Sequence, residues 1–270
     1  MSTPLAKKFT LSDLRAARKS GAKVAMLTCY DYTTAGLMQQ AGVPALLVGD
    51  SAANVILGHD TTLPVSLSFM IEITAAVRRG APLCWVMADM PFGSYQGSLD
   101  RGVRNVCRMV KRTGCDAVKI EAGPSQLKLV AELAQAGVAV IAHLGLRPQS
   151  IGLLGGYRVQ GRGAAEAAEI QELAIRMAEA GAAGVLLEAV PPAVARSVVD
   201  AVNIPVIGCG AGPACAAHVF VTHDALGLTP HAPKFVPRLG NLTQPMIEYF
   251  SDYVRRVESA QYPTEEHAYE

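Results

Sequence analysis

The sequence has few charged residues and no long apolar run. Only 17% of its 270 residues are charged and 50% are hydrophobic, so a large buried core is available. The formal net charge of +1 gives no electrostatic reason to expect nucleic acid or an anionic membrane surface as a partner. No apolar run approaches the roughly 20 residues that span a bilayer. Residues 1–20 also lack the apolar core of a secretory signal, so we expect a cytoplasmic protein without membrane or nucleic-acid partners.

The six cysteines lack the paired spacing of a metal site. Cys29, Cys84 and Cys209 lie within apolar runs that are typical of buried strands. We therefore expect free, buried thiols in a reducing compartment.

The sequence is rich in short apolar runs that end abruptly in an acid or a histidine. These runs end at Asp50, Asp89, Glu121, His143 and Glu188. Each follows a helix-like stretch that stops at a glycine, namely Gly42, Gly80, Gly114, Gly137 and Gly181. Short apolar runs are typical of buried parallel strands, and a glycine past a helix end adopts the left-handed cap without steric cost. Parallel strands would gather the polar ends at one edge of one sheet, where α/β folds place their active sites.

Eight such strands are predicted in alternation with helices. The first is Val24–Thr28 and the eighth is Val219–Thr222, which runs into His223 and Asp224. This count over about 250 residues predicts a (β/α)₈ TIM barrel, with an open doubly wound sheet as the alternative. No composition break divides the chain, so we expect one domain over residues 1–270, with an N-terminal helix over 11–19. A helix over about 243–260 is expected to close the domain, and residues 261–270 form a polar tail.

Three carboxylates at the ends of consecutive predicted strands suggest a metal site. Asp50, Asp89 and Glu121 would repel one another if they converged without a cation. Mg²⁺ prefers oxygen ligands and commonly takes carboxylates together with substrate oxygens and water. The alternative is that some of these acids cap helices or pair with arginines.

Lys119, Glu188 and His143 are candidates for the remaining chemistry. Lys119 lies two residues before Glu121 and so shares its face of the strand; it could bind a substrate carboxylate or form a Schiff base. Nearby carboxylates would keep it protonated, which disfavours the Schiff base. Glu188, on the sixth strand across the barrel, suits a general base. His143 could be a ligand, a base or a hydrogen-bond partner that orients another group.

A glycine-rich segment, residues 208–212, follows the seventh strand, where many barrels hold phosphate. It lacks the Lys-Ser/Thr of a P-loop and opens no Rossmann unit. It could instead allow close approach of a bulky ligand to the backbone.

Several long motifs together resemble one family. They are Thr28-Cys29-Tyr30-Asp31, Val48-Gly49-Asp50-Ser51, Gly58-His59-Asp60-Thr61-Thr62-Leu63-Pro64-Val65, Ala88-Asp89-Met90-Pro91-Phe92, Val118-Lys119-Ile120-Glu121, His143-Leu144-Gly145-Leu146, Gly156-Tyr157-Arg158-Val159-Gln160-Gly161-Arg162 and Ile204-Pro205-Val206-Ile207-Gly208. On these stretches the chain, from about residue 24 to 262, resembles the ketopantoate hydroxymethyltransferase family.

The resemblance implies a (β/α)₈ barrel that transfers a one-carbon unit from 5,10-methylenetetrahydrofolate to 3-methyl-2-oxobutanoate, giving 2-dehydropantoate (ketopantoate) for pantothenate biosynthesis. It implies Mg²⁺ held by Asp50, Asp89 and Glu121. It further implies that Asp50, Ser51, Asp89 and Lys119 contact the keto acid, that Glu188 accepts the proton, and that the protein forms a large cytoplasmic homo-oligomer, commonly a decamer.

Two departures from the family pattern stand out. Glu72-Ile73 replaces a usual Tyr-His pair, and Ala216-Ala217-His218 replaces a usual Asp-Gly-Gln. Both lie outside the expected metal site, so they bear on folate contacts or subunit packing rather than on the reaction.

Two alternatives to this function remain open. The first is a Mg²⁺-dependent lyase or aldolase that acts on another 2-oxo acid through the same enolate chemistry. The second is a non-catalytic barrel that serves in binding or assembly, although retention of the whole carboxylate set argues against it.

Overall fold

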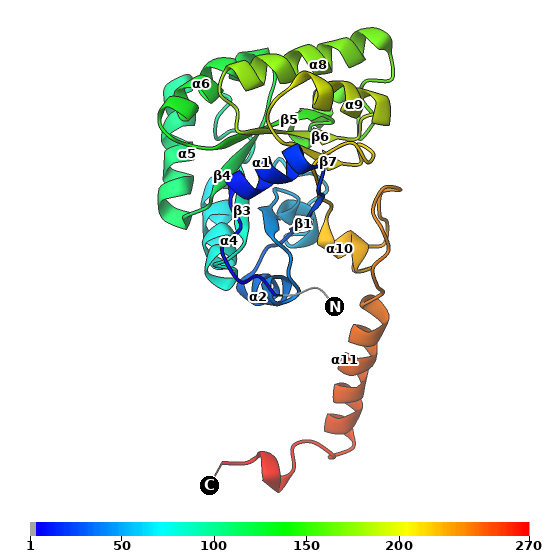
Figure 1. The fold of residues 1–270 in the computed structure, drawn as a ribbon. Coiled ribbons are helices and arrows are strands. Elements are labelled where there is room, and N and C mark those ends of the chain that lie inside the picture. The colour runs from blue at the N-terminus through cyan, green and yellow to red at the C-terminus, as the bar shows by residue number, and fades with distance from the viewer. Residues whose placement is uncertain (1–3, 270) are drawn as a thin grey trace. The chain divides into compact units, whose positions relative to one another are not determined.

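A computed structural model describes residues 4–269 of the chain. The chain divides into two compact units, which meet between residues 221 and 222 in the sequence (Figure 1). The expectation of one domain over the whole chain stays a prediction.

The first unit is a closed barrel of eight parallel strands in sequential order. The strands are β1 (Val24–Thr28), β2 (Ala45–Val48), β3 (Trp85–Asp89), β4 (Ala117–Glu121), β5 (Val140–Gly145), β6 (Gly184–Glu188), β7 (Val206–Cys209) and β8 (Ala217–His218). β8 pairs with β1, with Val24 opposite Ala217. This pairing closes the sheet, so the (β/α)₈ prediction is confirmed and the open-sheet alternative is wrong.

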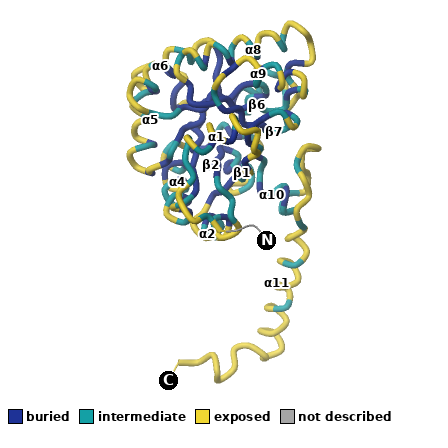
Figure 2. The backbone as a smooth tube through the Cα atoms, in the orientation of Figure 1, coloured by how far each residue is buried: buried dark blue, intermediate teal, exposed yellow. Residues whose placement is uncertain are grey.

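Helices surround the barrel and bury its outer face (Figures 1 and 2). The longer ones are α1 (Leu11–Ser20), α2 (Tyr32–Gln40), α4 (Leu67–Gly80), α5 (Leu99–Thr113), α6 (Leu127–Gln135), α8 (Ala164–Glu179) and α9 (Pro192–Ala201). Four short turns lie in loops: α3 (Ala52–Val55), η1 (Pro124–Gln126), η2 (Pro148–Ser150) and α7 (Ile151–Leu154). The connections that follow β2, β4 and β5 therefore contain helical turns rather than irregular chain alone.

Alternate residues of each strand face opposite sides of the sheet, which separates two apolar cores. Val118 and Ile120 of β4 pack outward against the helices. Ala117 faces the barrel interior, where it joins Met87 and Ile141. Polar residues that continue this inward alternation form the last layer of the interior, at the carboxyl ends of the strands. The sheet geometry therefore places the predicted site residues of β3, β4, β5 and β6 together. Asp50 instead lies past the end of β2, outside the inward alternation of that strand, and reaches the site from the turn that follows it.

The glycines that precede the strands behave as predicted, with one exception. Gly114 caps α5 in the left-handed conformation, with φ of 67°, which glycine adopts without strain. Gly80 instead lies within the last turn of α4. A Cβ at Gly80 would meet the carbonyl oxygen of Tyr32 at 2.2 Å. This glycine therefore permits close packing of α4 on α2 and is not a cap.

The predicted eighth strand is displaced in the sequence. Residues 217 and 218 form β8, whereas Thr222, His223 and Asp224 begin the short helix α10 (Thr222–Ala225). Val219–Thr222 carries the β-branched signal of a strand, but Ala217 pairs with both β7 and β1 and closes the barrel. His223 and Asp224 are therefore not strand-end residues.

The second unit contains α10, α11 (Thr243–Glu258) and the turn η3 (Glu265–His267). The predicted C-terminal helix is confirmed, but none of its residues is buried (Figure 2). Tyr249 and Phe250 are 73% and 62% exposed. Residues 261–269 are all exposed, as expected for a polar tail; residue 270 lies outside the described residues.

All six cysteines are free, as predicted. Cys29, Cys84, Cys115 and Cys215 are buried, while Cys209 is half-buried and Cys107 is exposed. No helix within residues 4–269 combines the length and hydrophobicity that a bilayer crossing requires.

Candidate active site

The strand-end residues converge in the last interior layer of the barrel. The pairing register sets Asp89 opposite Lys119 and Glu121 opposite His143. Asp50, Asp89, Lys119, Glu121 and His143 are all buried, and the side chain of Glu188 is 20% exposed. Four acids, one lysine and one histidine therefore share a largely dry space.

Lys119 is the cation of this cluster. Its Nζ lies 3.0 Å from Oδ1 of Asp89 and 3.1 Å from Nδ1 of His143. Burial opposes the charged form, but Asp89 and the other carboxylates of the cluster outweigh it and raise the pKa of Lys119. Lys119 is therefore an ammonium ion, which is the state that binds a carboxylate and disfavours Schiff-base formation.

Asp50 and Asp89 are adjacent on neighbouring strands. The backbone N–H of Asp50 donates to Oδ2 of Asp89 at 2.9 Å. Burial raises the pKa of Asp89 to about 7; Lys119 opposes the shift and Asp50 adds to it. The fold thus buries two carboxyl groups side by side, and a cation bound between them would relieve the repulsion of their negative charges.

Glu121 has one carboxylate oxygen engaged and one without a partner. Oε1 accepts a 2.9 Å hydrogen bond from the backbone N–H of Gln149. Oε2 is buried and has no hydrogen-bond partner among the described residues. Burial raises the pKa of Glu121 to about 8, against the opposing charge of Lys119. An unpartnered buried oxygen of this kind is costly unless another group meets it.

His143 lies between Lys119 and Glu188. Its Nε2 is 3.1 Å from Oε2 of Glu188. Burial and the Lys119 charge hold the pKa of His143 well below its usual range, so the ring is neutral. A neutral ring cannot neutralise Glu188, and burial raises the pKa of Glu188 to about 7 while Lys119 opposes the shift. A carboxylate with this pKa is suited to proton transfer near neutral pH.

The backbone around Glu188 is tightly fixed. Ala189, the next residue, has the unusual φ of 47°. Its N–H donates to the carbonyl of Cys209, and its carbonyl accepts from the N–H of Gln160, both at 2.9 Å. Strained residues held in this way are frequent at functional sites. The position of the Glu188 side chain is therefore set by contacts on both sides of its strand.

Gln149 and Tyr95 belong to the site although no strand pattern marks them. The Gln149 amide Nε2 donates to Oδ2 of Asp50 at 2.8 Å and to the carbonyl of Met90 at 2.9 Å. Its Oε1 accepts from the Tyr95 hydroxyl at 2.8 Å. Tyr95 in turn accepts from the backbone N–H of Glu121 at 3.1 Å. Tyr95 lies in the loop after β3 and Gln149 in the connection after β5. A long connection such as the one over residues 146–163 is often functional, and its length is the one signal in the sequence that could have pointed to Gln149.

Ser51 and Asp31 differ in their surroundings. The hydroxyls of Ser51 and Tyr30 lie 2.9 Å apart, so Ser51 lies beside Asp50 at the end of β2. Asp31, which follows β1, is exposed and caps α2 by accepting from the N–H of Thr34. Asp31 is thus a helix cap rather than part of the cluster.

The carboxylate oxygens of the cluster meet some of the requirements of a site for a hard cation. Within residues 4–269, no three side chains of His, Cys, Asp or Glu are arranged to hold a metal ion. Nevertheless, Glu121 has a buried oxygen without a partner, and the pKa values of Asp89 and Glu121 are raised. Mg²⁺ commonly needs only one or two carboxylates when substrate and water complete its octahedron. The cluster therefore fits Mg²⁺, while the three-ligand set Asp50, Asp89 and Glu121 stays a prediction.

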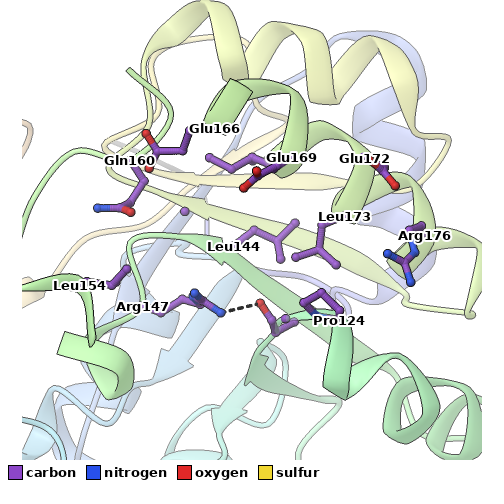
Figure 3. Close-up of a pocket in the computed structure, with 14 residues that line it drawn as sticks. Pro124, Leu144, Arg147, Leu154, Gln160, Glu166, Glu169, Glu172, Leu173 and Arg176 are labelled. Carbon is purple, nitrogen blue, oxygen red and sulfur yellow. Dashed lines mark hydrogen bonds between the residues drawn. The ribbon is translucent and has the colours of Figure 1, made fainter. Parts of the chain in front are cut away.

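A pocket of about 400 Å³ opens beside this cluster, on the outer side of the sheet edge (Figure 3). It lies between α8 and the chain that follows β4 and β5. Its lining contains none of the acidic cluster residues. The pocket therefore lies outside the cluster, next to the chain segments that follow Glu121 and His143.

The fold and the cluster define the class of this protein as a (β/α)₈ barrel enzyme, with a candidate acid–lysine active site at the carboxyl ends of its strands. The model of the family described as ketopantoate hydroxymethyltransferase matches residues 8–265. The chain belongs to this family.

Curated relatives agree with the family assignment. The 3-methyl-2-oxobutanoate hydroxymethyltransferase of Mycolicibacterium vanbaalenii is 45% identical over 253 residues, which covers 93% of this chain and 90% of that protein. The enzyme of the same name from Carboxydothermus hydrogenoformans is 42% identical and covers 97% and 95%. These names give the lyase and non-catalytic alternatives no support.

Solved structures show the same fold. A 2,3-dimethylmalate lyase of the PEP mutase/isocitrate lyase superfamily superposes with a TM-score of 0.63 at 17% identity, covering 98% of this chain and 93% of that one. A phosphonopyruvate hydrolase in complex with oxalate and Mg²⁺ gives 0.60 at 16% identity, covering 94% and 100%. At this identity the likeness shows the barrel alone.

Proposed function

We propose that this protein transfers a hydroxymethyl group from 5,10-methylenetetrahydrofolate to 3-methyl-2-oxobutanoate, giving 2-dehydropantoate for pantothenate biosynthesis. The observation that carries the proposal is the placement of Glu188 beside a buried acid–lysine cluster. A base poised near neutral pH beside an ammonium ion is what enolate formation from a 2-oxo acid requires. Membership of the family supports the choice of substrates.

The keto acid binds beside Lys119 in this proposal. Its carboxylate pairs with the Lys119 ammonium, and its oxygens lie against Ser51, Asp50 and Asp89. Because the site is largely dry, a charge pair formed there is stronger than in water. This placement leaves the substrate carbon next to the carbonyl free to face Glu188.

Asp50, Asp89 and Glu121 would hold Mg²⁺ in the proposed enzyme. The ion supplies positive charge for the substrate oxygens, on which negative charge grows as the enolate forms. Gln149 fixes Asp50 through its side chain and Glu121 through its backbone N–H. The carboxylates are thereby held in place before the substrate arrives.

Glu188 acts as the general base. It removes the proton from the substrate carbon next to the carbonyl, and the electron pair moves toward the keto oxygen. The same carbon then forms the new C–C bond to the methylene carbon of the folate. Both bonds from that carbon to the folate nitrogens break, and water supplies the hydroxyl oxygen of the product. Tetrahydrofolate leaves with two added protons on nitrogen, one from the substrate carbon and one from water. His143, which is buried and neutral, orients Glu188 through the contact of its Nε2 with Oε2 and does not take the proton itself.

A product assay tests this function. The protein is incubated with 3-methyl-2-oxobutanoate, 5,10-methylenetetrahydrofolate and Mg²⁺, and 2-dehydropantoate is measured by mass spectrometry. We expect product that disappears when either the folate or Mg²⁺ is omitted. Turnover of the keto acid without folate would point to a lyase instead.

We also propose that the protein works in the cytoplasm as a homo-oligomer, with a decamer as the expected state. Free thiols suit a reducing compartment. The exposed apolar residues of α11, among them Ile247, Tyr249 and Phe250, are the kind of surface that self-association covers. Sedimentation of the full chain should give a mass near ten subunits; a monomer would contradict this part of the proposal.

A further inference from the structure

The pocket outside the barrel mouth has unpaired charges of both signs on an apolar floor. Its apolar floor includes Leu144 of β5 and Leu173 of α8, which lie near the middle of the pocket (Figure 3), and Ile170 of α8 also lines the pocket. Its charged residues are Arg147, Glu166, Glu169, Glu172 and Arg176. Among residues 4–269, no ion pair involves any of these five side chains. Opposite charges that line one pocket without pairing are available to a ligand that carries both kinds of group.

The charges are spread along the length of α8 rather than concentrated at one point. Glu166 lies near the start of the helix and Arg176 ten residues later, which is about 15 Å at the rise of an α-helix. Figure 3 shows Gln160 and Glu166 at one end of the pocket and Glu172 and Arg176 at the other, with Leu144 and Leu173 between them. The pocket therefore suits an elongated ligand with an apolar middle.

One end of the pocket lies next to the backbone that carries Glu188, the proposed base. The backbone N–H of Gln160 donates to the carbonyl of Ala189, the residue after Glu188. Arg147 donates to the carbonyl of Ala122 at 3.2 Å and precedes the η2 turn that carries Gln149. Gly145 pairs with Glu188 across the sheet. A ligand at this end therefore lies against the same backbone segments that hold the base.

The chemistry of a reduced folate matches this arrangement. Its pterin edge presents an N–H and an amino group side by side, which a carboxylate accepts as a pair of hydrogen bonds. Its flat aromatic middle suits an apolar floor, and its glutamyl carboxylates suit an arginine. The reactive one-carbon unit lies next to the pterin. The pterin must consequently occupy the end of the pocket that is nearer to Glu188.

We infer that this pocket binds the folate co-substrate, with Glu166 receiving the pterin edge and Arg176 binding the glutamyl carboxylate. The inference rests on the proposed function, because it assumes that the one-carbon donor is a folate. It adds the location and the direction of that donor. The keto acid then binds inside the barrel mouth and the donor approaches from outside, over the chain that follows β5 and β6.

Calorimetric titrations of the full-length protein, kept under nitrogen, test this inference with two probes: tetrahydrofolate and tetrahydropterin, which lacks the glutamyl tail. Glu166→Gln should weaken binding of both probes by about tenfold or more, since a charge-assisted pair of hydrogen bonds is lost. Arg176→Gln should weaken tetrahydrofolate similarly and leave tetrahydropterin unchanged. The matched control is Glu179→Gln, an exposed residue of the same helix outside the pocket, which should bind both probes as wild type does.

Wild-type affinity for tetrahydrofolate in either pocket variant overturns the inference. Failure of the wild-type protein to bind tetrahydrofolate overturns it as well. Exchange of the keto-acid proton in deuterium oxide, measured on wild type without folate, is read separately. Its absence would contradict the proposed base chemistry whatever the titrations give, so the two failures are distinguishable.

Discussion

The side-chain amide of Gln149 donates a 2.8 Å hydrogen bond to Oδ2 of Asp50, although the two residues are 99 positions apart. The backbone N–H of Gln149 also binds Oε1 of Glu121. One loop residue therefore ties together acids from the ends of β2 and β4. Because both contacts are buried, neither acid can move without leaving a polar group unpaired.

Replacement of Gln149 should loosen this arrangement. Gln149→Leu removes the hydrogen bonds to Asp50 and Met90 and leaves the Tyr95 hydroxyl only its longer, 3.4 Å hydrogen bond to the carbonyl of Glu121. Unpaired buried groups of this kind cost about 1–3 kcal/mol each, so the denaturant midpoint should fall and the KM for the keto acid should rise. Gln171→Leu, which affects a single longer hydrogen bond on α8, is the control. Equal behaviour of the two variants would remove Gln149 from the site.

Glu188→Gln should nearly abolish proton removal. Glutamine keeps the size of the side chain but cannot accept the proton, and loss of a positioned base costs roughly 10²–10⁴-fold in rate. Exchange of the keto-acid proton in deuterium oxide with Mg²⁺ and without folate, followed by NMR, isolates this step. Keto-acid binding by calorimetry should be little changed. An undiminished exchange rate would direct attention to His143 as the base.

The pH dependence of exchange should report the same residue. Burial raises the pKa of Glu188 to about 7, and only the deprotonated carboxylate accepts a proton. The rate should therefore rise with pH up to about 7, and below that value fall by roughly tenfold for each unit of pH. Initial exchange rates measured across this range give the midpoint. A midpoint near the ordinary glutamate value would contradict a buried base.

Asp89→Asn should weaken Mg²⁺ binding while the fold is kept. The asparagine oxygen can still accept from the N–H of Asp50, but one negative charge is lost from the proposed metal site. Since even residues that only support metal ligands change affinity by about 10–100-fold, we expect at least that loss. Titration with Mg²⁺ in the presence of keto acid measures it, and circular dichroism verifies the fold. Unchanged affinity would exclude Asp89 as a ligand.

Lys119 should form no covalent adduct with the substrate. Its raised pKa keeps it protonated, and an ammonium ion has no lone pair with which to attack a carbonyl. Treatment with borohydride in the presence of 3-methyl-2-oxobutanoate should leave the mass of the protein unchanged. A reduced adduct mapped to Lys119 would replace the metal–enolate scheme with an enamine.

In β3, β4, β5 and β6, strand periodicity was sufficient to predict which side chains meet inside the barrel, whereas Asp50 lies past the end of β2 and outside its inward alternation. In β4 the residues that alternate with Val118 and Ile120 must face inward, so Lys119 and Glu121 share one face. Such a rule exists only where the backbone is regular. Gln149 and Tyr95 come from loops, whose course depends on contacts with distant segments, and no local pattern marked them.

The two incorrect predictions about the fold also arose because contacts with distant segments decide the local structure. The β-branched run at Val219–Thr222 has strand propensity, yet the barrel closes through Ala217 and His218 because these residues pair with β7 and β1. Similarly, Gly80 resembles a cap in sequence but is required by the close approach of Tyr32. Each outcome was decided by a neighbour far away in the chain.

The last interior layer of the barrel has a consequence for thermal robustness. Burial removes Asp89, Glu121 and Glu188 from water without fully compensating their charge, and it raises the pKa of each. A barrel with well-packed apolar residues in this layer would therefore have a higher melting temperature, but it could not carry out the proposed reaction. The barrel mouth is therefore the part of this fold that serves the proposed reaction at the expense of stability.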